Sequence, residues 1–152
     1  MNDKPKTLDE VREFLSRVPY INGGGCGVAA LAMYRWLKNH GDVSSGFRFV
    51  ACYDSDYDDD NRYINNMKVL RTKKGKAMAT SHIAIMNGNQ VIDCNGNVFL
   101  PRYSLIQFIE AEWFITNMIN NTGSWNPSFN RDNIKVIEKT LDIDLSEIKK
   151  VD

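Results

Sequence analysis

Two residue types that support nucleophilic catalysis are scarce in this chain, which has three cysteines and two histidines among 152 residues. Cys26 follows a run of glycines at 23–25 and begins an apolar segment that we expect to be a helix. The positive end of a helix dipole lowers the pKa of a thiol and stabilises the thiolate. A free cysteine on a helix is also common as a small buried apolar residue. The flexible glycine loop before Cys26 favours its interpretation as a nucleophile over that as a buried structural residue.

A cysteine nucleophile needs a base, and only one histidine can reach Cys26. His40 lies at the far end of the same expected helix, about 20 Å away at 1.5 Å per residue, and we expect it to be solvated. His82 begins the apolar run of residues 82–86, which is typical of a strand. His82 is therefore the predicted general base.

A hairpin after His82 supplies a candidate for a third catalytic residue beside Cys26 and His82. Asn87-Gly88 separates two apolar runs, a strong hairpin signal. A two-residue turn at 87–88 places Asp93 opposite His82, and a turn at 88–89 places Asn95 there. Both registers keep Asp93 and Asn95 on the face of His82, since side chains alternate along a strand. We expect Asp93 to orient His82, with Asn95 as the second choice; both residues also suit a simple turn at 93–96.

The elements that must position these residues predict one α+β domain over residues 1–152, with a catalytic core at about 20–120 and a helical tail at about 125–152. Thr7 and Glu10 form a T-x-x-E capping box before an apolar stripe, so residues 7–18 should be a helix that Pro19 ends. Residues 26–39 should form a central buried helix ended by Gly41. Further helices are expected at 61–72, 104–110, 131–141 and 145–150, strands at 47–53, 78–86 and 90–94, and 112–118 is ambiguous.

Composition excludes several classes of function. The formal net charge is zero, which argues against nucleic acid as the partner. The first residues lack the apolar region of a secretory signal, and no apolar run approaches the roughly 18 residues of a membrane span. We therefore expect no membrane association and a cytoplasmic location. Cys52 and Cys94 form no paired spacing with Cys26 and are expected to be buried free thiols.

Metal sites are not favoured. The aspartates at 54, 56, 58 and 60 alternate as in a calcium-binding loop, but Asp59 stands where glycine is needed and Asn65 where glutamate is needed. No paired-cysteine or H-E-x-x-H spacing supports zinc at Cys26, His82 and Asp93. We expect a solvated acidic loop, and neither a metal nor an organic cofactor.

The order of these motifs resembles the papain-like cysteine peptidase superfamily, especially its small bacterial and phage hydrolases. Residues 24–30 read GGCGVAA, 81–85 read SHIAI and 91–93 read VID, and these motifs span about residues 22–96, roughly half of the chain. The resemblance implies a papain-like fold, with a central cysteine-bearing helix packed on a small antiparallel sheet that carries the histidine and the aspartate. It also implies a Cys–His–Asp triad, a thioester intermediate, and a peptide, protein or cell-wall peptide as substrate.

Two positions depart from this family. The glutamine that donates to the oxyanion in papain-type enzymes is missing, and Asn22 or Tyr20 occupies its region. Glycine and valine also follow Cys26 where an aromatic residue is typical. The expected oxyanion donors are the Cys26 N–H and either Asn22 or Tyr20. Deamidation or transglutamination at the same thioester, and a catalytically degenerate binding or inhibitory module, possibly phage-encoded, are the alternative functions.

Overall fold

The computed structural model describes residues 4–21, 25–40, 47–54, 82–87, 89–109, 112–122 and 130–149. They form a mixed α+β structure, as the sequence predicts. In chain order the elements are α1 (Leu8–Ser16), α2 (Cys26–Asn39), β1 (Phe47–Tyr53), β2 (His82–Asn87), β3 (Gln90–Asp93), β4 (Gly96–Asn97), the 3-10 turn η3 (Leu100–Arg102), β5 (Leu105–Ile109), α4 (Glu112–Thr122) and α5 (Arg131–Leu141).

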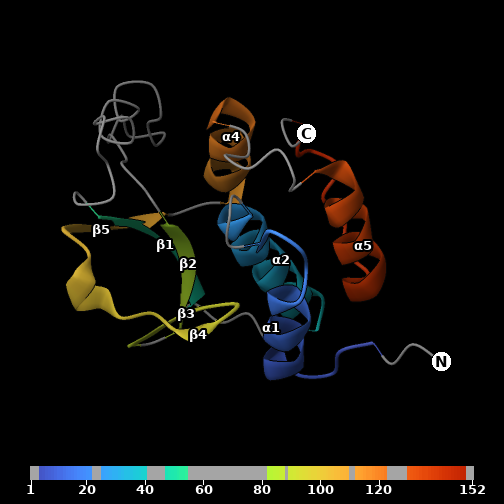
Figure 1. Cartoon of the computed structure of the whole chain (residues 1–152), viewed down its shortest axis with the longest axis horizontal. Helices are drawn as coiled ribbons and strands as arrows, with labels where there is room; N and C mark the ends of the chain where they lie inside the picture. Colours follow the sequence, from blue (N-terminus) through green and yellow to red (C-terminus); the bar gives the residue numbers. More distant parts are fainter. Residues whose placement is uncertain are drawn as a thin grey trace.

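The strands form one antiparallel sheet in the order β4-β3-β2-β1-β5. The α-helices of the described residues, α1, α2, α4 and α5, lie on one side of this sheet, and α2 lies against it (Figure 1). The apolar side chains of the sheet alternate between two clusters. Phe49, Ala51 and Ile85 pack against the helices, while Val50 and Ala84 belong to a smaller cluster on the opposite face.

Helix α2 is buried because its residues are apolar on most sides. Ala29, Ala30 and Ala32 are fully buried, and these small side chains let neighbouring elements approach the helix closely. Gly27 makes the closest approach, since a Cβ there would lie 3.2 Å from Cγ1 of Ile119 on α4. This packing fixes the end of α2 that carries Cys26.

Helix α1 begins where the capping motif predicts. The Thr7 hydroxyl accepts a hydrogen bond from the Glu10 N–H at 3.1 Å, which satisfies one of the free donors of the first turn. Val11 and Leu15 are fully buried against the core. The helix ends at Ser16, so Val18 and Pro19 lie in the turn that leads towards Cys26.

Two expected helices are wrong. Residues 105–109 form strand β5, not part of a helix at 104–110, because the run pairs with β1 in an antiparallel register from Tyr53↔Leu105 to Phe49↔Ile109. Short apolar runs fit either structure, and here the edge of a sheet decides between them. Residues 145–149 form a turn and irregular chain instead of a helix, although Leu145 and Ile148 are fully buried as the apolar periodicity requires.

The C-terminal segment belongs to the main core. Ile134, Ile137 and Leu141 of α5 are buried in the same cluster as α2. The Arg35 guanidinium links this segment to α2 and α4. Its Nε donates to Glu112 at 3.2 Å, its Nη1 donates to the Asp144 carbonyl at 2.7 Å, and its Nη2 pairs with Glu147.

Several expectations lie outside the described residues. They are the terminator Gly41, residues 55–60 of the acidic run, the helix at 61–72 and the first part of the strand at 78–86. The ambiguous segment at 112–118 lies in helix α4. In the described part of the chain, no helix is long and apolar enough to cross a membrane.

Candidate active site

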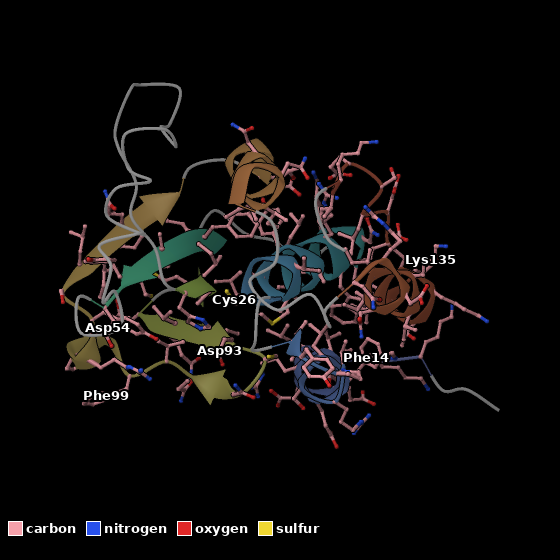
Figure 2. The ribbon with its side chains drawn as sticks, turned by 45° about the horizontal axis from the view of Figure 1, so that its top comes forward. Phe14, Cys26, Asp54, Asp93, Phe99 and Lys135 are labelled. Atoms are coloured by element: carbon pink, nitrogen blue, oxygen red, sulfur yellow. The ribbon has the colours of Figure 1, made fainter. Side chains whose placement is uncertain are left out.

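Cys26 is the first residue of α2, and the residue is half-buried. The N-cap is Gly25, which has no side chain to occupy the free N–H groups, and the first turn contains no acidic residue. The partial positive charge of the helix end is therefore available to an anion at this place. In Figure 2, Cys26 lies between α2 and the sheet, with Asp93 close by.

The surroundings of Cys26 favour its thiolate. Burial alone raises the pKa of this thiol, but a hydrogen bond and the positive charge of His82 lower it, as do hydrogen bonds from the N–H groups of Ile83 and Gly27. The net effect lowers the pKa below the ordinary 9.0. A lowered thiol pKa and partial accessibility are the properties that characterise nucleophilic cysteines.

His82 and Asp93 lie together as the hairpin parity predicts. Nε2 of His82 is 2.8 Å from Oδ2 of Asp93, which leaves Nδ1 of the imidazole for Cys26. The hairpin uses the second of the two registers considered, because Asn87 pairs with Gln90. Extended to the start of β2, this register would place Asn95 opposite His82, so Asp93 reaches the imidazole from the neighbouring position on the same face.

Asp93 is held by the turn that follows it. Its Oδ1 accepts the backbone N–H of Asn95 at 2.8 Å, while Oδ2 faces His82. Burial raises the pKa of Asp93, but the hydrogen bond from His82 and the backbone N–H groups of Asn95 and Gly96 lower it overall. The turn and catalytic interpretations of Asp93 are thus compatible. Asn95 contributes a backbone donor, and its side chain is exposed.

The surroundings of His82 favour its imidazolium form. Burial lowers the pKa of His82, yet the hydrogen bond to Asp93 and the hydrogen bond and charge of Cys26 raise it to about 10. Since the pKa of Cys26 is lowered, both shifts favour a thiolate–imidazolium pair. The pair titrates as one unit, losing its net neutrality only when the thiolate is protonated or the imidazolium is deprotonated.

At the other two cysteines burial outweighs every effect that favours the thiolate. Cys52 and Cys94 are buried, as expected, and burial with nearby negative charge raises the pKa of each to about 12. Their proximity to the site was not predicted. Cys52 is the Cα partner of His82 across the β1–β2 pair, and its thiol senses the charge of Cys26.

Of the two candidate side-chain donors to the oxyanion, Asn22 and Tyr20, only Tyr20 belongs to the described residues. Asn22 lies outside the described residues. Tyr20 has a positive φ of 63° and is 54% exposed. A left-handed backbone costs free energy for a residue with a Cβ. Next to Tyr20, the Ile21 carbonyl accepts a hydrogen bond from the Gly25 N–H at 2.9 Å. The Cys26 N–H is the donor that the geometry of α2 supports directly.

Sequence reasoning missed one neighbour of His82. Tyr103, just after η3, has its ring centroid 6.4 Å from that of His82, with the ring planes 6° from parallel. Arg102 and Asp54 lie next to this tyrosine, with their side chains 3.8 Å apart. No sequence signal could reveal this contact, because Tyr103 and His82 meet only through the folding of the segment after β4 across the sheet.

No protein family model, curated protein or solved structure matches this chain. Within the described residues, no three histidine, cysteine or acidic side chains lie together so that they could hold a metal ion. The geometry of Cys26, His82 and Asp93 is therefore the basis for a proposed function.

Proposed function

We propose that this protein is a cysteine hydrolase that cleaves an amide, peptide or isopeptide bond through a thioester. The observation that supports this most is the chain of contacts from the Cys26 thiol through the His82 imidazole to the Asp93 carboxylate, at the uncapped start of α2. Helix dipole, imidazolium and backbone donors all stabilise the same negative charge on sulfur. An inert structural cysteine does not need this combination.

The reaction follows from the resting ion pair. The Cys26 thiolate attacks the acyl carbon. The developing oxyanion accepts hydrogen bonds from the Cys26 N–H and from a second donor in the preceding loop. The His82 imidazolium gives its Nδ1 proton to the leaving amine, so the C–N bond breaks and a thioester remains. Neutral His82 then takes a proton from water, hydroxide adds to the thioester, and the acid leaves as the thiolate–imidazolium pair forms again.

Asp93 acts through His82 in this scheme. Its carboxylate fixes the ring so that Nδ1 faces the sulfur, and it stabilises the imidazolium that forms in each cycle. The turn hydrogen bond from Asn95 keeps the carboxylate itself in place. The triad is therefore anchored by α2, β2 and the turn after β3.

A papain-like arrangement is part of the same proposal. In its support, a cysteine-bearing helix packs on an antiparallel sheet, and the histidine and the acid follow in that order on adjacent strands. We further propose a peptide, protein or cell-wall peptide as the acyl donor. Because the three cysteines are free thiols, a reducing compartment such as the cytoplasm suits the nucleophile.

The test uses an activated ester in place of the unknown substrate. Wild-type protein is incubated with p-nitrophenyl acetate and followed by nitrophenolate release and intact mass, with peptide mapping of the acetylated residue. We expect a burst, an acetyl group on Cys26 and its slow release to water. Cys26→Ser should abolish the burst, while Cys52→Ser, the matched control on the adjacent strand, should keep it.

Three outcomes separate the alternatives. Turnover with release to water supports the hydrolase, and faster release when a primary amine is added supports acyl transfer at the same thioester. A Cys26 acetyl group that forms and is never released would indicate a degenerate site in a binding module. Absence of a Cys26 adduct, or equal labelling of all three cysteines, would refute the nucleophile itself.

A further inference from the structure

Tyr103 lies on the same face of the sheet as His82. Cys52 and His82 are Cα partners across β1 and β2, so their side chains share a face. Tyr103 packs against the apolar cluster of that face, which includes Cys52 and Ala84. The chain after β4 therefore brings the tyrosine ring to the imidazole from a segment that carries no member of the triad.

The two rings are nearly parallel. Their planes differ by 6°, and the 6.4 Å between their centroids corresponds to an offset arrangement within the 4.5–7 Å range usual for aromatic pairs. The imidazole also makes hydrogen bonds at its edge, through Nε2 to Asp93 and to the thiol of Cys26. Hydrogen bonds at the edge fix where the nitrogens point, and an adjacent ring limits the tilt of the plane.

Tyr103 is itself held from both sides. Its N–H donates to the Leu100 carbonyl at 3.0 Å, which closes the η3 turn, and the next residue, Ser104, donates its N–H to the Tyr53 carbonyl at 2.8 Å. The Arg102 guanidinium lies 5.2 Å from the Tyr103 ring centroid and 3.8 Å from Asp54. The end of β1 thus anchors the tyrosine through both a backbone and a side-chain contact.

We propose that Tyr103 is a positioning residue, whose ring keeps the His82 imidazolium in the plane in which Nε2 meets Asp93 and Nδ1 meets Cys26. This inference rests on the proposed function, since it assumes that the Cys26–His82 pair is the reactive group. Tyr103 acts through His82 and takes no part in bond making. The aromatic ring is the required feature, and the hydroxyl is not.

The experiment measures the alkylation rate of Cys26 by chloroacetamide from pH 5 to 11, with the modified residue located by peptide mass spectrometry. Tyr103→Leu should slow Cys26 alkylation at pH 7 about threefold to tenfold, the size expected for loss of one aromatic contact. Tyr103→Phe should stay within about twofold of wild type because it keeps the ring. Phe99→Leu is the matched control, since Phe99 lies on the same segment, is 69% exposed and lies away from Cys26 and Asp93 in Figure 2.

A second readout separates positioning from general stability. The His82 Nε2 proton, held by Asp93, should give a slowly exchanging imidazole signal in proton NMR. Tyr103→Leu should broaden this signal, while the backbone amide spectrum should still be that of a folded protein. If Tyr103→Leu does not fold, Tyr103→Met, which fills similar space with a flexible chain, replaces it. A Tyr103→Leu protein with wild-type alkylation and an unchanged imidazole signal overturns the inference.

Failure of the inference is distinct from failure of the proposed function. If His82→Ala slows alkylation of Cys26 and Tyr103→Leu does not, the ion pair stands and only the role of Tyr103 is lost. If neither variant changes the rate, the nucleophile proposal fails with it.

Discussion

Replacement of His82 by alanine should remove most of the reactivity of Cys26 near neutral pH. In the wild type, the hydrogen bond and charge of His82 are the largest effects that lower the pKa of Cys26, and burial opposes them. The variant keeps burial and the N–H donors of Gly27 and Ile83 only. At Cys52 and Cys94 burial is the largest effect on the thiol, and the pKa of each is about 12. We therefore expect the pKa of Cys26 in the variant to exceed the ordinary 9.0.

The size of the effect follows from this shift. At a pKa of 9.0 about one thiol in a hundred is ionised at pH 7, and the lowered pKa of wild-type Cys26 makes the ionised fraction larger. The thiolate of a less acidic thiol is intrinsically more nucleophilic, with a Brønsted coefficient of about 0.4–0.5. For every two units by which the thiol pKa rises, this restores nearly tenfold of the lost alkylation rate. The net expectation is a loss of about tenfold or more in the alkylation rate at pH 7.

The assay is site-specific alkylation by chloroacetamide as a function of pH, with His40→Ala as the matched control. His40 is the C-cap of the same helix, stacks on Trp36 with ring centroids 4.0 Å apart and hydrogen-bonds the Trp36 carbonyl at 2.8 Å, so its loss should leave the profile of Cys26 unchanged. The gap between wild type and His82→Ala should narrow as the pH rises. Equal rates at pH 7, or a wild-type profile centred at or above 9, would refute the reasoning.

Three further results are expected. Asp93→Asn removes the charge that raises the pKa of His82 to about 10, so the alkaline limb of the Cys26 alkylation profile should move to lower pH; an unmoved limb contradicts this. The pKa of Asp93 itself is lowered in the folded state, so its contribution to stability is present above pH 3.8 and is lost as the pH falls through the folded value. Urea unfolding at several pH values should therefore show the stability difference between wild type and Asp93→Asn shrinking in acid, and a difference that grows there would be the opposite outcome. Arg35→Met should lower the free energy of unfolding by about 1–3 kcal/mol because two glutamates lose a partly buried partner. Lys38→Met, at the 60% exposed end of the same network, should cost less than about 1 kcal/mol, and equal losses would contradict the assignment.

Features that depend on near neighbours along the chain were predictable. The cap at Thr7, the bounds of α2 and of β1, and the shared face of His82 and Asp93 all follow from short-range rules of helices, strands and hairpins. Hairpin parity is the strongest of these, because a two-residue turn keeps the face of each side chain whichever pair of residues forms it. This is why the contact between His82 and Asp93 survived a register different from the first choice.

Only the tertiary structure decided the rest. Residues 105–109 carry an apolar run that fits a helix or a strand, and pairing with β1 made it a strand. Cys52 and Tyr103 were brought to His82 by strand pairing and by the folding of a loop across the sheet, contacts between residues far apart in the chain. The sequence by itself was sufficient to predict Cys26, His82 and Asp93 as the candidate catalytic residues. The packing of α2 on the sheet determined the lowered pKa of Cys26, because the pKa of a thiol depends on which groups surround it in space.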